Sequence, residues 1–216
     1  MIYELRTYTT KPGAAPIMAK NAATVGRDIR GNDYGKLEGY WLTEIGPLNQ
    51  ILHLWSYADM NERMEKRAAL GQNARWRAEY QPLNSGLMIR QDIRLMTAVV
   101  DPKPPEASAN IYEFRNYRLA PGAMKLWCDA FTQALPAREK HSKIVGLFVT
   151  EAGQPNEVCH IWAYPDLGAR AAARAAAARA AAVADPGWQA FLKVSGPKIE
   201  EMWSTVMLPA SHSPLQ

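Results

Sequence analysis

Two histidines carry the residue pattern with the clearest chemical potential. His53 opens the run His-Leu-Trp-Ser-Tyr, and His160 opens the matching run His-Ile-Trp-Ala-Tyr, 107 positions later (160 − 53). Because side chains alternate between the two faces of a β-strand, the His, Trp and Tyr of each run point to one face. Histidine titrates near neutral pH and can act as an acid, a base or a metal ligand. His53 and His160 are therefore our candidate catalytic residues.

An arginine and a tyrosine accompany each histidine. Residues 3–8 and 112–117 share the pattern Tyr-Glu-x-Arg-x-Tyr, which puts Glu, Arg and the second Tyr on one strand face. A lining of His, Trp, Tyr and Arg suits a planar or anionic small molecule. The predicted ligand-binding residues are Arg6, Tyr8, Trp55, Tyr57, Arg115, Tyr117, Trp162 and Tyr164. The structural alternative is that each histidine bonds a neighbouring strand or Glu4 while the rings fill the core.

The glutamates of this pattern have two interpretations of their own. Glu4 with Arg6, and Glu113 with Arg115, can form ion pairs inside the sheet. A buried ion pair adds little net stability, although breaking it is costly. Its repetition indicates a requirement for specificity or for a ligand, and a purely structural pair is the alternative.

An internal repeat predicts the elements that position these residues. The first strand motif returns 109 positions on (111 − 2) and the histidine motif 107 positions on, so we expect a small indel between Arg27 and Leu37. Each copy reads as strand, helix, strand, strand, helix, strand, the ferredoxin-like βαββαβ order. We predict an α+β fold of two such tandem units packed sheet to sheet as an α/β barrel, with the ring-bearing side chains lining the hollow between the sheets.

Apolar spacing and turn residues set the expected boundaries. In the first copy we expect strands at 2–9, 37–45, 50–57 and 87–99, helices at 60–70 and near 76–80, and Asp59 as a helix N-cap. In the second copy, Asp166 has the same capping role, an alanine-rich helix covers about 167–183, a short helix 188–194 and a last strand 199–208. The first helix of each copy shows an apolar stripe. The stripes consist of Met18, Ala22, Val25 and Ile29, and of Met124, Trp127, Phe131 and Leu135.

Composition narrows the class of protein. The chain has 216 residues, 48% of them hydrophobic, which is enough for a real core. A net charge of +4 without a dense basic run argues against nucleic-acid binding, and no stretch is apolar enough to span a membrane. Cys128 and Cys159 are expected to be buried reduced thiols, and the strand-like start predicts no secretory signal. We expect a cytoplasmic protein.

Three proline residues within 101–109 predict a stiff linker between the copies. The expected domains are 1–100 and 110–209, and residues 210–216 are expected to form a flexible tail. Because the bare face of each sheet must be covered, self-association of the chain is expected as well.

At these motifs the chain resembles the NIPSNAP family, whose members carry one or two copies of a domain of the dimeric α/β-barrel superfamily. The resemblance rests on 112–117 followed by Pro121-Gly122, on 160–167 and on Met207-Leu208-Pro209. The second copy is the closer match, and the alanine-rich helix departs from the family's more charged pattern. The family has no settled enzymatic activity. Eukaryotic members are associated with mitochondria and with partner proteins, but this chain is expected to lack their transit segment.

Cofactor and metal sites have little support. His53, His141, His160 and His212 show no HxH or HxxxH spacing, so no metal site and no cofactor are predicted. A haem held by one strand histidine is the alternative that the barrel superfamily implies.

Three functions remain open from the sequence. The first is a binding protein with a His/Trp/Tyr/Arg-lined pocket for a small apolar or aromatic molecule. The second is a cofactor-free oxygenase or isomerase with His160 or His53 as base and Arg115 or Arg6 steadying an enolate-like anion. The third is a protein-interaction scaffold. A deep pocket lined by these side chains would separate the first two from the third.

Overall fold

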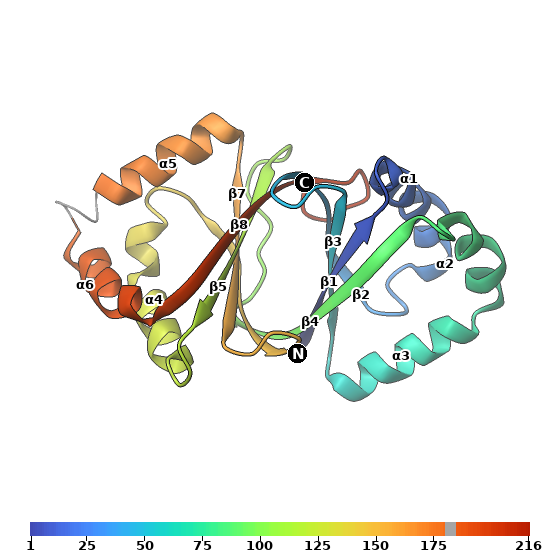
Figure 1. The fold of residues 1–216 in the computed structure, drawn as a ribbon, viewed down its shortest axis with the longest axis horizontal. Helices are drawn as coiled ribbons and strands as arrows, with labels where there is room; N and C mark the ends of the chain where they lie inside the picture. Colours follow the sequence, from blue (N-terminus) through green and yellow to red (C-terminus); the bar gives the residue numbers. More distant parts are fainter. Residues whose placement is uncertain (180–184) are drawn as a thin grey trace. The chain divides into compact units, whose positions relative to one another are not determined.

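The computed structural model describes residues 1–179 and 185–216 and confirms the predicted α+β fold with two tandem βαββαβ copies. The chain forms two compact units. Unit 1 comprises Met1–Thr97, Glu151–Gly153 and Met207–Gln216, and unit 2 comprises Ala98–Thr150 and Gln154–Val206. In each unit the helices cover one face of that unit's own antiparallel sheet (Figure 1). No helix in the described ranges is long and apolar enough to cross a membrane.

The first copy of the repeat follows the expected order of elements. Its four strands are β1 (Ile2–Thr10), β2 (Lys36–Ile45), β3 (Gln50–Tyr57) and β4 (Met88–Val100). Its helical segments are α1 (Ala14–Asn21), the π-helical turn η1 (Ala22–Gly26), α2 (Arg27–Arg30), α3 (Met60–Gln72), the π-helical turn η2 (Trp76–Tyr80) and the 3₁₀ turn η3 (Pro82–Asn84). Asp59 caps α3 as predicted, because its carboxylate accepts the backbone N–H of Glu62 at 2.9 Å.

The second copy repeats this order. Its strands are β5 (Ile111–Leu119), β6 (Ile144–Ala152), β7 (Glu157–Tyr164) and β8 (Ile199–Pro209). Its helical segments are α4 (Met124–Arg138), α5 (Leu167–Arg179), α6 (Pro186–Ser195) and the 3₁₀ turn η5 (Gly196–Lys198). The predicted end of the alanine-rich helix near Val183 lies outside the described residues. Both cysteines are buried and neither forms a disulfide.

Strand register places the predicted site residues side by side. The strand order is β4-β1-β3-β2 in the first copy and β8-β5-β7-β6 in the second. Across β1 and β3, Arg6 lies opposite His53, and across β5 and β7, Arg115 lies opposite His160. The repeat therefore fixes one arginine beside one histidine in each copy.

The hairpin turns explain why two residue types recur in both copies. Gly46 and Gly153 have φ angles of 121° and 106°, which favour glycine because it has no Cβ. Asn49 and Asn156 have φ angles of 57° and 60°, the left-handed region that asparagine tolerates. The repeated Gly and Asn are thus required by the same turn geometry.

The first helical segment differs from the prediction in a way that matters for the site. Its buried side is formed by Met18, Ala22, Gly26 and Arg30, whereas Val25 and Ile29 are only half-buried. The π-helical turn η1 inserts one extra residue into the helix, so the inward face moves from positions 25 and 29 to 26 and 30. The sequence pattern assumed a regular 3.6-residue period and could not anticipate this shift.

The regular helix α4 of the second copy shows the contrast. Its buried side is Trp127, Phe131, Ala134 and Arg138, spaced as a continuous α-helix requires. The offset between the copies falls from 109 to 107, and the extra residue in η1 accounts for one of these two positions. We expected both between Arg27 and Leu37, but η1 precedes that interval.

Candidate ligand-binding site

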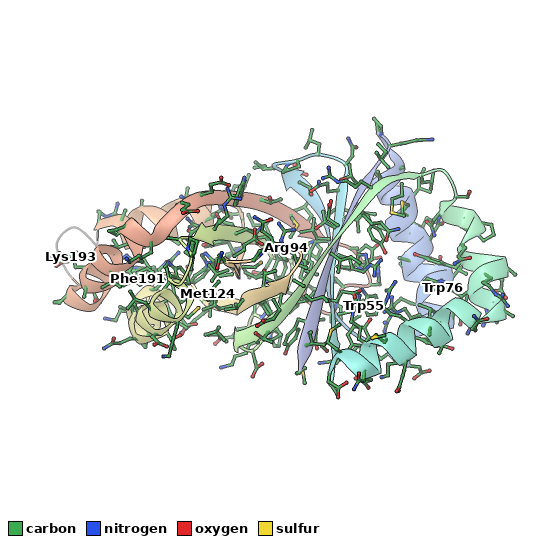
Figure 2. The ribbon with its side chains drawn as sticks, turned by 60° about the horizontal axis from the view of Figure 1, so that its bottom comes forward. Trp55, Trp76, Arg94, Met124, Phe191 and Lys193 are labelled. Carbon is green, nitrogen blue, oxygen red and sulfur yellow. The ribbon has the colours of Figure 1, made fainter. Side chains whose placement is uncertain are left out.

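A cavity of about 380 Å³ lies in unit 1, between the sheet and the helical segments that cover it. The sheet contributes Arg6, Tyr8, His53 and Trp55 to its lining. The helical layer contributes Trp76, which Figure 2 shows across from Trp55. We expected these side chains to line a hollow between the sheets of the two copies. That prediction was wrong. The histidine-bearing face of β3 points to the helices of its own unit, so the cavity belongs to unit 1.

The proton of His53 is fixed by its neighbour Trp55. The indole Nε1–H of Trp55 donates to Nδ1 of His53 at 2.5 Å. Because an indole nitrogen can only donate, Nδ1 must be the unprotonated nitrogen and the neutral ring carries its proton on Nε2. Nε2 is buried and has no hydrogen-bond partner. His53 therefore offers a cavity ligand an N–H donor rather than a base.

Rings and positive charges keep His53 neutral. Tyr40 stacks on the imidazole at a centroid distance of 5.1 Å, and Tyr8 meets it edge-on at 4.6 Å. Burial lowers the pKa of His53 well below its usual value, and the positive charges of Arg6 and Arg30 lower it further. The positive charges of Arg6 and Arg30 would attract an anion, whereas burial opposes a charge of either sign.

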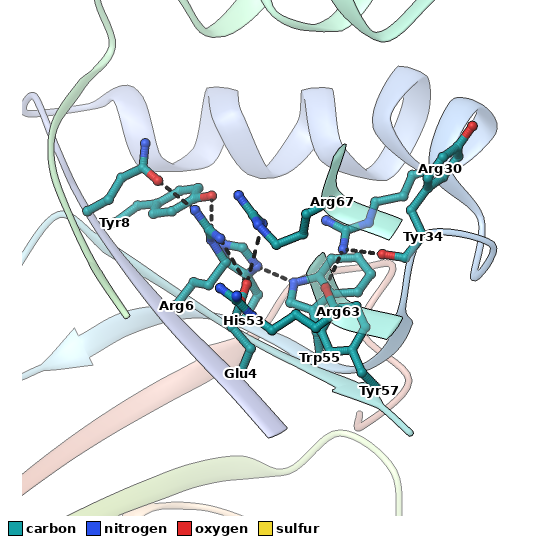
Figure 3. A network of polar contacts seen from close by, with 11 residues as sticks. Glu4, Arg6, Tyr8, Arg30, Tyr34, His53, Trp55, Tyr57, Arg63 and Arg67 are labelled. Carbon is teal, nitrogen blue, oxygen red and sulfur yellow. Dashed lines mark hydrogen bonds and ion pairs between the residues drawn. The ribbon is translucent and has the colours of Figure 1, made fainter. Parts of the chain in front are cut away.

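Glu4 organises the arginines beside the cavity, as Figure 3 shows. Its fully buried carboxylate accepts from Arg6 at 2.8 Å, and it also pairs with Arg63 and with Arg67, the latter at 3.5 Å. Burial alone would raise the pKa of Glu4, but the hydrogen bond and charge of Arg6 and the charges of Arg67 and Arg63 leave it lowered. The predicted Glu4–Arg6 ion pair is confirmed, and three guanidinium groups share its single negative charge.

Arg6 is held on three sides. Besides Glu4, its Nη2 donates to Gln91 at 2.7 Å and its Nε donates to the hydroxyl of Tyr8 at 3.0 Å. Tyr8 thus accepts from Arg6 and keeps its own O–H to donate. Arg6 and Tyr8 are oriented before any ligand arrives.

Arg30 is a cavity residue that the sequence did not single out. Its guanidinium lies 3.3 Å from the ring centroid of Trp55 and donates to the carbonyl of Tyr34 at 2.9 Å and to Tyr57 at 3.3 Å. Arg30 is only 7% exposed and its Nε has no partner. Burial lowers its pKa. Tyr57, a predicted ligand residue, positions Arg30 and is not itself part of the lining.

The C-terminal residues also reach the cavity. We expected a flexible tail at 210–216, but the backbone N–H of Ala210 donates to the carbonyl of Tyr40 at 2.9 Å, and Ser213 accepts the N–H of Tyr40 at 2.9 Å. These contacts place His212 in the lining, 4.4 Å from the ring of Tyr40. Burial, followed by the charge of Arg27, lowers the pKa of His212 to about 4.

Unit 2 gathers the other predicted residues into a cluster around His160. Trp162 donates to Nδ1 of His160 at 2.7 Å, and Tyr117 meets His160 edge-on at 4.7 Å. Tyr164 is buried on the same strand, and Arg115 lies over the ring of Tyr117. Where the cavity of unit 1 lies, Trp127 and Phe131 pack on His160.

The second predicted ion pair was wrong. Within the described chain, Glu113 pairs with Arg170 at 2.7 Å and Arg174 at 3.7 Å, and it accepts from Ser204, rather than pairing with Arg115. The reason is that helix α5 brings its arginines over the sheet. Arginines of the alanine-rich helix α5 thus neutralise a fully buried carboxylate.

Neither histidine suits metal or haem ligation. A metal-bound histidine ligates through one nitrogen and normally donates its other N–H to an acceptor. In His53 and His160 one nitrogen, Nδ1, instead accepts from a tryptophan, which leaves the buried Nε2 protonated and unable to ligate a metal. Among the residues that the structure describes, no three His, Cys, Asp or Glu side chains are grouped to hold a metal ion.

Comparison with known proteins identifies the family. The NIPSNAP family model matches the chain twice, over residues 3–101 and 112–214. The chain belongs to the NIPSNAP family. It is 31% identical to NipSnap homolog 1 of Danio rerio, in an alignment that covers all of this chain and 77% of the relative. It is 30% identical to NipSnap homolog 2 of Homo sapiens, covering all of this chain and 75% of that protein.

Solved structures support the fold of this NIPSNAP protein over almost its full length. An anthrone oxidase-like protein matches with a TM-score of 0.64 and 14% identity, covering 96% of this chain and 90% of the other. At this identity the likeness concerns the fold alone.

Sequence reasoning missed several lining residues for identifiable reasons. Arg30 has its counterpart in Arg138, but the drift of the repeat hid the match at an offset of 108 (138 − 30). Arg138 lies 4.5 Å from the ring centroid of Trp162, as Arg30 lies over Trp55. His212 was assigned to a tail, and Tyr40 was treated as an ordinary strand residue. A search for repeated Arg–Trp pairs would have found Arg30.

Proposed function

We propose that this NIPSNAP protein binds a small planar molecule with an anionic oxygen group in the cavity of unit 1. The observation that carries the proposal is the buried, unpartnered Nε2–H of His53 at a cavity whose lining includes Arg6, Arg27, Arg30 and Arg67 and no carboxylate among the described residues. An unpartnered buried donor is costly, so an acceptor on a ligand would stabilise the protein.

The apolar part of the lining supports an aromatic body for the ligand. Trp55 and Trp76 contribute aromatic rings, each with one face already covered, by Arg30 and by Tyr80 respectively. Met18, Leu37 and Leu70 offer aliphatic contacts. Ligand cavities of this size combine apolar walls with a few polar groups that fix orientation. A ligand whose anionic oxygen accepts from His53 and whose ring lies between the tryptophans would contact both the polar and the apolar parts of the lining.

The experiment compares 2-naphthoate with its uncharged analogue 2-naphthamide by isothermal titration calorimetry. We expect the wild-type protein to prefer the carboxylate by at least roughly 10-fold, since one charge-assisted hydrogen bond is worth about 1.5 kcal/mol or more. His53→Phe should abolish this preference while keeping the ring in place.

The matched control is His160→Phe in unit 2, which should leave the preference unchanged. Equal affinity of the wild-type protein for both probes would overturn the proposal. An effect of His160→Phe as large as that of His53→Phe would move the site away from the cavity.

A second candidate is a cofactor-free oxygenase or isomerase on the same cavity. His212 favours it, because this cavity residue is neutral at pH 7 and its Nδ1 has no hydrogen-bond partner. Nδ1 of His212 could therefore accept a proton from a substrate. The N–H of His53 could stabilise the enolate-like oxygen that results. Oxygen uptake in the presence of anthrone tests this candidate. Uptake that His212→Gln removes supports it, and no uptake by the wild-type protein counts against it.

A further inference from the structure

We infer that unit 2 contains a second copy of the ligand site that Trp127 and Phe131 plug, and that Met18 and Ala22 are the residues that keep the first copy open. This inference deepens the proposed function and rests on it for the class of ligand. The repeat supplies the correspondence: with Pro12-Gly13 matched to Pro121-Gly122, Met18 corresponds to Trp127 and Ala22 to Phe131 at the same offset of 109 (127 − 18, 131 − 22).

The polar residues around His53 have counterparts around His160 in the second copy. His160 is 3% exposed, accepts from Trp162 through Nδ1, and therefore carries its proton on a buried Nε2 that has no partner. Tyr117 meets His160 at 4.7 Å and 83°, and Tyr8 meets His53 at 4.6 Å and 79°. Arg115 lies opposite His160 in register, and its Nε also lacks a partner. Burying a donor without a hydrogen bond costs free energy, so these unpaired donors are not expected in a site that serves only as hydrophobic core.

The space above this polar set is filled by rings. Trp127 and Phe131 stack at 4.9 Å with an interplanar angle of 13°, and Phe131 lies 5.6 Å from His160. Phe191 of α6 packs on both rings at 5.7 and 5.5 Å. At the equivalent place in unit 1, a flexible Met18 and a single methyl group of Ala22 border the cavity.

The helix geometry reinforces the difference. The π-helical turn η1 begins at Ala22 and brings Gly26 to the cavity, where a Cβ would come within 2.9 Å of the ring of Tyr80. In α4 the helix stays regular and brings Ala134 inward instead. Residues at 18, 22 and 26 therefore set the volume above His53, and we assign ligand size selection to Met18 and Ala22.

The test opens the site of unit 2 in one variant and plugs the cavity of unit 1 in another. The opened variant carries Trp127→Met and Phe131→Ala, and the plugged variant carries Ala22→Phe. Binding of 2-naphthoate is measured by isothermal titration calorimetry, and near-ultraviolet circular dichroism confirms that each variant is folded. We expect one equivalent bound per chain for the wild type, two for the opened variant and none for the plugged variant.

Two further variants tie the new equivalent to unit 2. Adding His160→Phe to the opened variant should return it to one equivalent, and combining the opened and plugged changes should give one equivalent that His53→Phe does not affect. An opened variant that is folded and still binds only one equivalent would overturn the latent site. A plugged variant that binds like the wild type would overturn the role of Ala22, even if the opened variant fails to fold.

Failure of the proposed function looks different. If the wild type binds no 2-naphthoate, crystals pressurised with xenon still decide the inference. Xenon beside His53 in the wild type, and beside His160 only after Phe131→Ala, supports the plug. Phe131→Ala crystals without xenon beside His160 contradict it.

Discussion

Trp55 and His53 form a hydrogen-bonded pair across alternate positions of one strand, with the indole N–H 2.5 Å from Nδ1 of the imidazole. Trp162 and His160 repeat the pair at 2.7 Å. Because tryptophan only donates, both histidines are held as the tautomer with the proton on Nε2. The two-residue spacing of His and Trp along each strand therefore determines which imidazole nitrogen carries the proton. A general base at His53 or His160 does not fit this arrangement.

Trp55→Phe should release the tautomer of His53. The substitution leaves Nδ1 without its donor, so we expect a loss of about 1–3 kcal/mol in the free energy of unfolding. It should also weaken 2-naphthoate binding, because the proton then divides between the two ring nitrogens. Nitrogen-15 NMR of labelled histidine would show the Nε2–H form in the wild type and a mixture in the variant. Trp162→Phe is the matched control and should change His160 alone.

Stability should fall as the pH drops below about 6.5. Burial lowers the pKa of His53 and His160 well below 6.5 in the folded protein, so the unfolded chain binds more protons in this range. The stabilisation is complete above pH 6.5 and is lost as the pH falls towards the folded-state values, with a limiting slope of about 1.4 kcal/mol per pH unit for each histidine. Urea unfolding between pH 7.5 and 5 measures the slope, and His160→Gln should reduce it. An unchanged slope in that variant would contradict a buried neutral imidazole.

Glu4→Gln should destabilise unit 1 strongly. The substitution removes the negative charge that Arg6, Arg63 and Arg67 share at a position with no solvent exposure. Breaking a buried ion pair in this way costs about 3–5 kcal/mol, and the partial exposure of Arg67 places the expected loss at the lower end. Urea denaturation provides the measurement. Glu113→Gln, which leaves Arg170 and Arg174 without their partner, is the equivalent change in unit 2.

The strands and their partners could be predicted from the sequence because a two-residue period and a duplicated motif are local signals. The Glu4–Arg6 pair and the Asp59 cap followed from spacing and order. The register that sets Arg6 opposite His53 is a finding of the structure. The location of the cavity did not follow, because the histidine face of β3 could have pointed to either layer. Which layer it meets depends on packing between elements distant in sequence.

The helix and the C-terminal residues show a second limit. The π-helical turn η1 replaces Val25 with Gly26 on the inward face, and no residue type in that segment announces it. The docking of residues 210–216 depends on Tyr40, which is far away in the chain. The contrast of Met18 and Ala22 with Trp127 and Phe131 was visible in the sequence, but both sets satisfied the same apolar pattern. The structure shows that the smaller residues border the cavity of unit 1, whereas the larger rings pack on His160 in unit 2.

Arg30→Met should weaken binding of the carboxylate probe more than that of its amide. Arg30 adds a buried positive charge to the cavity lining, and its loss removes attraction for an anion but keeps an aliphatic contact with Trp55. We expect a roughly 10-fold loss for 2-naphthoate, or about 1.4 kcal/mol. Arg138→Met removes the equivalent cation of unit 2 and controls for general destabilisation. Equal losses for both probes would assign Arg30 to packing alone.

Ser213→Ala should loosen the C-terminal residues that hold His212 at the cavity. The side chain of Ser213 accepts the backbone N–H of Tyr40 at 2.9 Å, and its removal leaves that buried group without a partner. We expect a loss of about 1 kcal/mol in the free energy of unfolding, together with faster hydrogen exchange at the Tyr40 amide. Exchange followed by two-dimensional NMR resolves this amide from its neighbours. Because Tyr40 also stacks on His53 at 5.1 Å, the same variant should weaken 2-naphthoate binding. Unchanged exchange at Tyr40 would show that the contact with Ser213 does not hold the C-terminal residues in place.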